Sequence, residues 1–433
     1  MSRKSAFVRG AAVASALALT LGMSACSDSS TDTADNVPGS VSGQVTLLSP
    51  IFEGSAGQKL LEDELLPQFY EKYPDVTVKV DYTTYGKLNE KLTTSIVSGL
   101  VPDVMLMGVG WIEGFAEKGI LADLSETGLT KDTLAKDYNE TIIDAGMWDD
   151  KVYAVPIMLD TRFGVANMDL LKEAGYDAPP SNWAELVEMS QALTVRDSSG
   201  TLQRAGFDML SLDPRQAYET MLFSADGSLF NDDSTEATFN SPEGVDALQT
   251  MVDLVTKYKV EDIGFSSADA AVNPLLNGRA AMGIAHNNLW TQALEAAPDM
   301  LPKLEPFLIE DAAPGMFFGG TLATVSNNSK NPKAAQALLE FLSSPGPALA
   351  ANEQRGNVPA LTSLLDSDYV QSNRFVQFAM ENLDVAKREG GPSSWLEVRG
   401  DFKPAIEGAL LGQKTAQEAL DDLAALVQNS IDR

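Results

Sequence analysis

The chain has very few residues of the types that carry out covalent, redox or zinc chemistry. Its 433 residues include one cysteine, Cys26, and one histidine, His286. A single cysteine excludes an internal disulfide. A catalytic triad, a cysteine–histidine pair and a zinc site all lack their usual residues. We therefore expect no metal and no cofactor.

Phosphate-binding and calcium-binding motifs are also missing. The sequence contains no G-x-x-x-x-G-K-[ST] motif and no G-x-G-x-x-G after a predicted strand. The acidic turn at residues 231–233 does not follow the spacing of a calcium-binding EF-hand loop. The 61 acidic residues provide many chance carboxylate pairs, but no motif favours glycoside cleavage. We expect a protein without enzymatic activity, with an exported carbohydrate-active enzyme as the alternative.

Basic residues are scarce relative to acidic ones. The chain has 31 Lys and Arg and 61 Asp and Glu, which gives a net charge of −30. Such a chain is repelled by nucleic acid and by anionic lipid. A hydrophobic content of 44% supports a sizeable core, and the length favours two lobes over one compact core. No stretch after the N-terminus is apolar enough to span a membrane.

The N-terminus has the pattern of an export signal. Basic residues precede the short apolar run Ala11–Leu21, which is followed by small residues and Cys26. The placement of Cys26 resembles the lipobox of bacterial lipoproteins, although Met23 stands where leucine is usual. An ordinary signal peptide with an incidental cysteine is the alternative. We expect a signal peptide at 1–25, lipidation of Cys26, and a flexible Ser/Thr/Asp/Gly-rich tether at 26–43.

The remaining sequence alternates between strand and helix patterns, which favours an α/β fold with helices on both faces of a sheet. Strands are predicted at 45–48, 76–82, 104–107, 152–156, 280–284 and 321–325, with an extended segment at 160–167. Helices are predicted at 57–73, 85–98, 112–118, 181–193, 213–224, 241–258, 332–342, 366–383, 401–411 and 415–431. Ser181 is the expected N-cap of its helix.

Six segments, in order, resemble one family. They are LPQFYEKYPDVTVKV, SGLVPDVMLMGVGWIEGFAEKGILADL, KVYAVPIMLDTRFGVANMDLLKEAGYDAPPSNWAEL, GRAAMGIAHNNLW, FFGGTLATVSNNSKNPKAAQALLEFL and LLGQKTAQEALDDL. Together they resemble the carbohydrate-type (family 1) extracellular solute-binding proteins of bacterial ABC importers. The resemblance runs from about Val45 to the C-terminus.

The resemblance implies a two-lobed, type II periplasmic-binding-protein-like fold with parallel or mixed sheets and a ligand cleft between the lobes. It puts crossings between the lobes near 156–159, 318–321 and 357–359. The expected N-lobe is 44–158 with 322–358, and the expected C-lobe is 159–321 with 359–433. The implied function is capture of a mono- or oligosaccharide and delivery to ABC permease subunits by hinge closure. We expect a monomer, anchored by lipid to the outer face of the cell membrane.

Sugars need flat aromatic rings against their C–H faces and paired donors and acceptors for their hydroxyls. Trp111 follows a predicted strand at its carboxyl end, where α/β sheets bind ligands. The resemblance places Asp160, Arg162, Trp290 and the region of Trp395 and Arg399 at the cleft. The remaining candidates lie on loops, crossings or helix starts near it, and Gly319 and Gly320 would let backbone N–H groups approach a ligand closely. The full set of candidate ligand-binding residues is Glu53, Trp111, Asp160, Arg162, Tyr218, Asn287, Asn288, Trp290, Gly319, Gly320, Arg355, Trp395 and Arg399.

Several of these residues have a simpler structural interpretation. Trp111, Trp290 and Trp395 could be core anchors of their helices, and Asp160 with Arg162 could be an ion pair at the hinge. A phosphorylated ligand such as a glycerophosphodiester would suit Arg162, Arg355 and Arg399 if they converged. We expect Asp160→Ala or Trp111→Ala to weaken ligand binding with little change in the melting temperature of the free protein.

Overall fold

The computed structural model describes residues 41–266 and 272–433. The predicted signal peptide, Cys26 and nearly all of the predicted tether lie outside these residues. Within the described part, no helix combines the length and the apolar composition that a membrane span requires.

The strands form one large mixed sheet and a small two-stranded one. The strands are β1 (Gly43–Ser49), β2 (Val76–Tyr82), β3 (Val104–Gly108), β4 (Met147–Trp148), β5 (Lys151–Val152), β6 (Ala154–Asn167), β7 (Val195–Arg196), β8 (Leu202–Asp208), β9 (Ala280–His286), β10 (Leu304–Phe307), β11 (Ile309–Glu310), β12 (Pro314–Val325), β13 (Val358–Pro359) and β14 (Ala386–Arg388). The main order is β2-β1-β3-β12-β6-β9-β8-β7.

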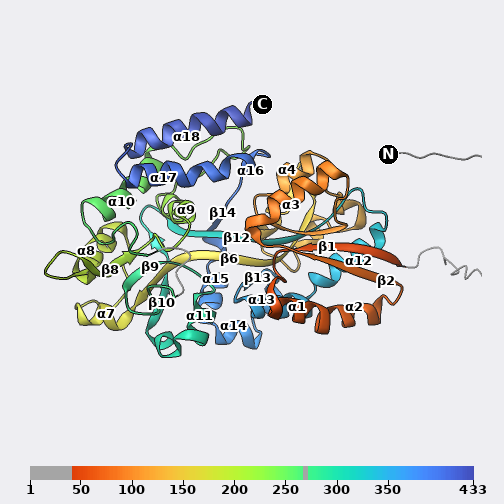
Figure 1. Cartoon of the computed structure of the whole chain (residues 1–433), viewed down its shortest axis with the longest axis horizontal. Coiled ribbons are helices and arrows are strands. Elements are labelled where there is room, and N and C mark those ends of the chain that lie inside the picture. The colour runs from red at the N-terminus through yellow and green to blue at the C-terminus, as the bar shows by residue number, and fades with distance from the viewer. Residues whose placement is uncertain (1–40, 267–271) are drawn as a thin grey trace, which may run out of the picture. The chain divides into compact units, whose positions relative to one another are not determined.

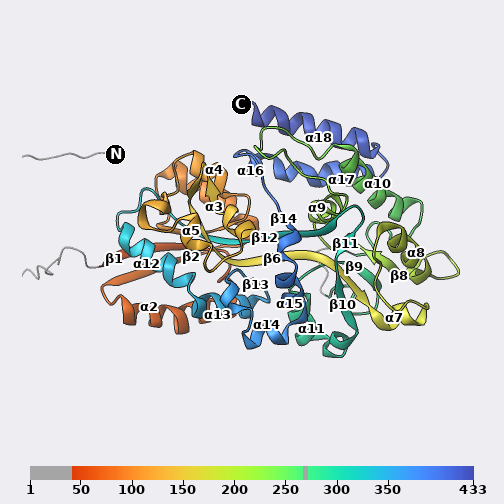
Figure 2. The ribbon, with the colours of Figure 1, turned by 180° about the vertical axis from the view of Figure 1, so that it is seen from behind.

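Helices cover this sheet on both faces (Figures 1 and 2). The α-helices are α1 (Gly54–Lys59), α2 (Leu66–Lys72), α3 (Tyr85–Ser98), α4 (Ile112–Glu117), α5 (Lys131–Leu134), α6 (Glu140–Asp144), α7 (Met168–Glu173), α8 (Trp183–Leu193), α9 (Pro214–Ser224), α10 (Pro242–Thr256), α11 (Leu289–Ala296), α12 (Pro332–Leu342), α13 (Pro345–Arg355), α14 (Asp368–Ser372), α15 (Arg374–Glu381), α16 (Trp395–Val398), α17 (Phe402–Leu410) and α18 (Ala416–Ile431).

Two long antiparallel strands, β6 and β12, run through the centre and join two lobes (Figure 1). The first lobe is built around the parallel strands β1, β2 and β3, and the second around the parallel pair β8 and β9. With 14 residues, β6 spans roughly 45 Å, which is long enough to serve both lobes. The short strand β13 pairs with β6 near its middle and adds a further crossing.

The buried apolar side chains form two clusters, and the larger one extends from the first lobe into the second, where it includes Ala205 on β8 and Ala280 on β9. Trp111 belongs to a large cluster that includes Val45, Leu106 and Phe69, whereas Trp395 belongs to a second cluster with Phe239 and Tyr218. A contact between Trp111 and the neighbourhood of Trp395 therefore joins the two apolar clusters.

The central crossing has a strict backbone requirement at Gly320. This residue has a φ of +147°, and a Cβ placed on it would lie 2.3 Å from the carbonyl oxygen of Met158 on β6. No side chain larger than hydrogen fits there without moving one of the two strands. Because β6 and β12 carry several candidate ligand residues, their close approach fixes the spacing of the site.

Most predicted elements are present, and the differences have local causes. The helix predicted at 366–383 is two helices, because the side chain of Asn373 accepts hydrogen bonds from the backbone of Phe375 and Val376 and starts α15 anew. Asn182, not Ser181, is the N-cap of α8, since its side chain accepts from the backbone of Glu185. The strand predicted at 321–325 is only the end of β12.

A buried pair of carboxyl groups in the second lobe makes stability depend on pH. Burial raises the pKa of Glu261 well above its ordinary 4.5, and the adjacent Asp208 raises it further. The hydroxyl of Ser266 lies 2.9 Å from Glu261 Oε1 and 3.0 Å from Asp208 Oδ1. The folded protein thus holds a proton that the unfolded chain releases above about 4.5, so this stabilisation is lost as pH rises through the raised pKa.

Glu261→Gln should mimic the protonated side chain and remove this loss. We expect the difference in melting temperature, variant minus wild type, to increase by roughly 1–3 °C from pH 5 to pH 8. Differential scanning fluorimetry across this range measures the effect, with Glu71→Gln on the exposed face of α2 as the control. A difference from wild type that stays constant or shrinks with rising pH would contradict the assignment.

Candidate functional site

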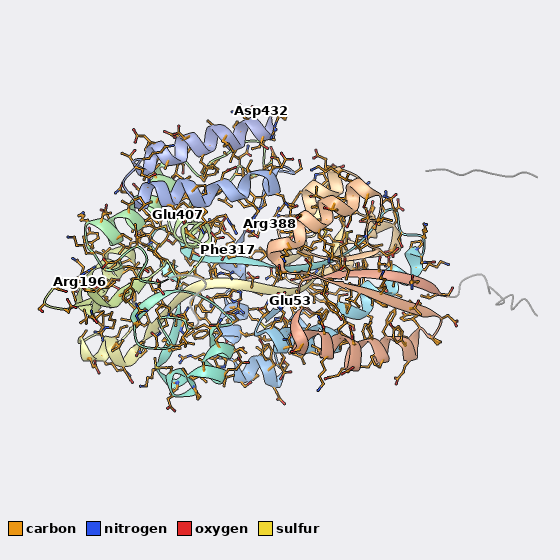
Figure 3. All side chains as sticks on the ribbon, in the orientation of Figure 1. Glu53, Arg196, Phe317, Arg388, Glu407 and Asp432 are labelled. Atoms are coloured by element: carbon orange, nitrogen blue, oxygen red, sulfur yellow. The ribbon has the colours of Figure 1, made fainter. Side chains whose placement is uncertain are left out.

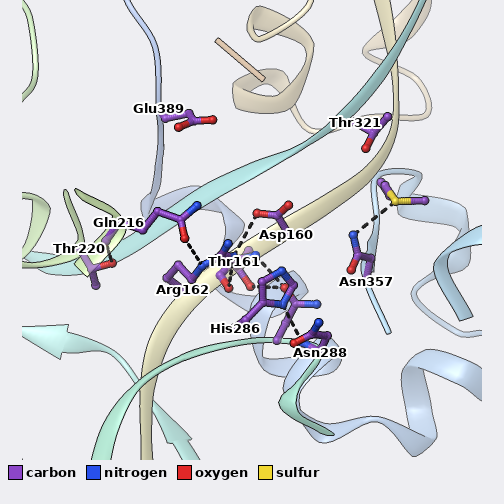
Figure 4. Close-up of polar contacts among 12 residues, drawn as sticks. Asp160, Thr161, Arg162, Gln216, Thr220, His286, Asn288, Thr321, Asn357 and Glu389 are labelled. Carbon is purple, nitrogen blue, oxygen red and sulfur yellow. Dashed lines mark hydrogen bonds and ion pairs between the residues drawn. The ribbon is translucent and has the colours of Figure 1, made fainter. Parts of the chain in front are cut away.

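A polar network lies on β6 where it passes between the lobes. Arg162 Nη1 donates to Asp160 Oδ1 at 3.0 Å, and Arg162 Nε donates to Gln216 Oε1 on α9 at 3.0 Å (Figure 4). Strand alternation puts Asp160 and Arg162 on one face. The guanidinium is buried, whereas the Asp160 side chain remains 23% exposed. The ion pair therefore presents a fixed carboxylate that can still accept a hydrogen bond from a ligand.

The first lobe contributes Tyr85, the first residue of α3, to the same region. Its hydroxyl forms a hydrogen bond with Thr321 Oγ1 on β12. Burial raises the pKa of Tyr85 above its ordinary value; the negative charges of Asp160 and Glu389 raise it further, and the positive charge of Arg355 lowers it. The phenol therefore remains a protonated donor. Its electrostatic neighbours come from both lobes.

The only histidine of the sequence, His286, is the last residue of β9. The backbone N–H of Asn288 donates to His286 Nδ1 at 2.9 Å (Figure 4). Burial lowers the pKa of His286 well below its ordinary value, and the nearby positive charges of Arg162 and Arg355 lower it further. The imidazole is therefore neutral, and because Nδ1 accepts from Asn288, the proton is on Nε2, which is left as a donor.

A second polar network is buried between α9 and the segment that follows β14. Arg215 Nη1 donates to Glu219 Oε1 at 2.7 Å and to Glu389 Oε2, and Arg399 Nη2 lies 3.6 Å from Glu389 Oε2. Arg215 is 2% exposed and Glu219 is fully buried. Burial raises the pKa of Glu219 to about 7, with Arg215 opposing the shift and Glu389 adding to it. Arg215, Glu219 and Glu389 thus lie together out of water, and the partly exposed Arg399 lies at the edge of this network.

Two tryptophans flank this buried charge network. The Arg215 guanidinium carbon lies 5.9 Å from the centre of the Trp395 ring, and that of Arg399 lies 5.7 Å from the Trp111 ring. Both are cation–π distances. Trp111 is 5% exposed and Trp395 is fully buried, so both indoles are held rigidly.

Buried polar atoms without a hydrogen-bond partner gather at this place. Among the described residues they include Nε1 of Trp111, Nε1 of Trp395 and Oε2 of Glu219. Oε2 of Glu113, Nη2 of Arg215 and Oγ of Ser394 join them. Buried polar groups in folded proteins nearly always have partners, so these atoms require hydrogen-bond partners from bound water or from a ligand. Donors and acceptors are both represented, which suits hydroxyl groups.

The described residues contain no group of three or more His, Cys, Asp or Glu side chains arranged to hold a metal ion. The candidate site is thus built from indole, guanidinium, carboxyl, phenol and amide groups contributed by both lobes. Such groups can bind a polar organic molecule by stacking and hydrogen bonding.

Comparisons with known proteins give the family. The model of the bacterial extracellular solute-binding protein family matches residues 53–348, well over half of the chain. The chain belongs to this family. A maltodextrin-binding protein of Bacillus subtilis is 26% identical to this solute-binding protein, with 98% of this chain and 97% of that protein covered.

Other similar proteins show how widely the fold is shared. An uncharacterised lipoprotein of Streptomyces antibioticus is 28% identical, with 65% of this chain and 63% of that protein covered. Among solved structures, the GacH receptor of Streptomyces glaucescens, studied unliganded and with acarbose, has a TM-score of 0.74 at 23% identity, with 90% of this chain and 99% of that chain covered. The two-lobed α/β fold is therefore that of the binding proteins.

The solute-binding protein brings together some of the predicted ligand residues. Trp111, Asp160, Arg162 and Arg399 belong to the networks described above. Glu53 is the N-cap of α1 and lies near the middle of the molecule, as do Phe317 and Arg388 (Figure 3). Gly319 and Gly320 pair with Asp160 and Leu159 on β6, and Asn288 lies beside His286.

Other predicted ligand residues have structural partners. Tyr218 is fully buried and donates to the carbonyl oxygen of Phe239, so it does not face the site. Asn287 is fully buried; it accepts from the backbone of Thr161 and donates to the carbonyl of Gly356. In this structure both side chains are engaged in hydrogen bonds to the backbone.

Three further predicted residues have structural contacts and also lie near the candidate site. Trp290 packs on Phe375 with ring centres 5.5 Å apart. Arg355 Nη1 donates to the carbonyl oxygen of Ile51 at 3.0 Å, which ties α13 to the loop before α1. Trp395 lies at the site but is fully buried. A ligand could therefore reach the Trp395 ring only if the two lobes moved apart.

Sequence reasoning missed Tyr85, Gln216, Glu219 and Glu389. Tyr85 begins a helix directly after a strand, which is a usable signal because ligands bind at the carboxyl ends of strands in α/β sheets. Glu219 lies one helical turn from both Arg215 and Gln216 on α9, and polar side chains at this spacing are common on helices, so the sequence does not mark them. Glu389 lies in a loop after a three-residue strand, with nothing in its neighbours to mark it.

Proposed function

We propose that this protein captures a neutral, hydroxyl-rich ligand, a mono- or oligosaccharide, between its two lobes and delivers it to the permease of an ABC importer. The observation that supports this most is the collection of unpaired buried donors and acceptors beside Trp111 and Trp395. Indole rings suit the C–H faces of a sugar, and mixed donors and acceptors suit its hydroxyls. The sugar ligands named for its relatives agree with this chemistry.

A phosphorylated ligand is the second candidate, and the charges disfavour it. Arg162 is paired with Asp160, and Arg399 with Glu389. Arg355 donates to a backbone carbonyl. A phosphate would have to displace these acceptors and would meet the charge of Asp160 and Glu389 at close range. Arg162 and Arg399 hold carboxylates in place here. A neutral ligand is not repelled by these carboxylates.

The remaining features of the proposal concern the setting of the protein. Acylation of Cys26 and the tether at 26–43 would keep the binding protein at the outer face of the membrane. The lobes would consist of 44–158 with 322–358 and of 159–321 with 359–433, and the protein would act as a monomer. We further propose that it has no enzymatic activity of its own.

A thermal-shift screen tests the ligand class. The panel contains glucose, maltose, maltotriose, lactose and diacetylchitobiose, with glycerol 3-phosphate and glycerophosphocholine as the phosphorylated arm. A binding sugar at 100 times its Kd should stabilise the fold by about 2.7 kcal/mol, which raises the melting temperature by a few degrees. A shift only in the phosphorylated arm would overturn the neutral-ligand assignment. Sugar cleavage detected by chromatography at enzyme-like rates would overturn the binding-protein assignment.

A further inference from the structure

Helix α4 of the first lobe touches the segment after β14 of the second lobe through glycines. A Cβ placed on Gly114 would lie 2.3 Å from the carbonyl oxygen of Ser393. A Cβ placed on Gly390 would lie 2.6 Å from the Cα of Gly110. Backbone therefore meets backbone here, with no room for a side chain.

Charged pairs surround this backbone contact. Arg388 Nη1 donates to Glu113 Oε1, and the Glu113 side chain is buried by the contact. Farther out, Lys118 Nζ lies 4.0 Å from Glu397 Oε1, with both side chains exposed. In each pair the acidic and the basic residue come from opposite lobes, so the pairs form only when the lobes are close.

We propose that the glycine joint, defined as Gly110, Gly114, Gly390 and Ser393, is the contact that holds the two lobes closed over a ligand. Its residues act as positioning residues, because they bring Trp111 on one lobe to Arg399 and Glu389 on the other without being needed as hydrogen-bonding groups. The presence of a ligand in this proposal rests on the proposed function, whereas the contact between the glycines is present in the structure without a ligand.

The joint should determine how long a ligand stays bound. A ligand gains from closure only the difference between its interactions in the closed and open states. A methyl group at Gly114 would force the two backbones apart and raise the free energy of the closed state alone. Entry into the open site would be unaffected, whereas release would be faster.

Zero-length carbodiimide cross-linking of the full chain measures the joint directly. The reagent joins Lys118 to Glu397 when the lobes are closed, and mass spectrometry quantifies the linked peptides. Gly114→Ala should lower this product about tenfold. The Lys414–Asp422 pair, 2.6 Å apart within the second lobe, reports on intact folding and should cross-link equally in both proteins.

Two further variants complete the test. Gly346→Ala is the matched control, because a Cβ there meets no atom within 4 Å, and it should leave both cross-links unchanged. Glu113→Gln keeps the side-chain shape but removes the charge pair, and it should lower the Lys118–Glu397 product two- to fivefold. Retention of that product in both Gly114→Ala and Glu113→Gln would overturn the proposal, as would an equal loss in Gly346→Ala.

Stopped-flow binding of maltotriose adds the functional measurement. In Gly114→Ala the dissociation rate should rise about tenfold while the association rate changes less than twofold. An equal fall in association rate would indicate a damaged site and would overturn the positioning role. Absence of maltotriose binding in the wild type would count against this ligand for the proposed function, and the cross-linking result would still decide the joint.

Discussion

Arg215→Met is expected to destabilise the protein by about 3–5 kcal/mol, which is the typical cost of removing one partner from a buried ion pair. Methionine fills much of the volume of the side chain but leaves Glu219 and Glu389 without their shared guanidinium. Because Arg215 opposes the rise in the pKa of Glu219, its loss should raise that pKa above its present value of about 7. Folding would then require a protonated Glu219, so the destabilisation should be larger at pH 8 than at pH 5.

Urea unfolding followed by circular dichroism at both pH values measures this loss. Arg374→Met is the matched control, since Arg374 pairs with Glu305 on the exposed surface and should cost at most about 1 kcal/mol. An Arg215→Met loss no larger than that of the control would show that the buried network contributes nothing beyond a surface pair.

Asp160→Asn is expected to weaken ligand binding roughly ten- to hundredfold, because a hydrogen bond to a charged group contributes about 1.5–3 kcal/mol. Asparagine keeps the shape of the side chain and an oxygen that can accept from Arg162. Isothermal titration with the panel sugar that gives the largest thermal shift measures the change. Asp169→Asn, on an exposed pair with Lys303, is the control and should bind normally.

The structure alters one expectation for this position. The sequence alone predicts that Asp160→Ala leaves the melting temperature of the free protein nearly unchanged. The buried Arg162 depends on Asp160 for one of its partners, so alanine should also lower stability. Asparagine separates the two effects. Unchanged affinity in Asp160→Asn would remove Asp160 from the ligand site.

The elements that sequence patterns predicted well are those whose signal is local. The strand Val76–Tyr82 alternates between apolar and polar residues, and its predicted bounds agree with β2. The helix predicted at 85–98 ends where Gly99 adopts a left-handed conformation. Both boundaries depend only on neighbouring residues.

The prediction was poorer where tertiary contacts determine the structure. Only the last five residues of the 12-residue β12 were recognised, because its first part gains strand geometry from pairing with β6 and β14. The break at Asn373 was missed because helical periodicity continues across it, while the side chain caps the next helix. Neither outcome is visible in a window of one strand or helix.

By itself the sequence determined the composition-level facts and the fold class. One cysteine and one histidine exclude several chemistries, and ordered motifs along the chain indicated two α/β lobes of the solute-binding family, which the family match supports. These features depend on residue identity and local order.

Only the tertiary structure decided which polar residues meet. It joined Arg215 both to Glu219 on the same helix and to Glu389, 174 residues later in the chain, and it engaged the side chains of Tyr218 and Asn287 in hydrogen bonds to the backbone. The physical reason is that the partner of a buried charge or amide is determined by how strands and helices pack. That packing places distant residues within hydrogen-bonding distance without leaving a pattern near either of them.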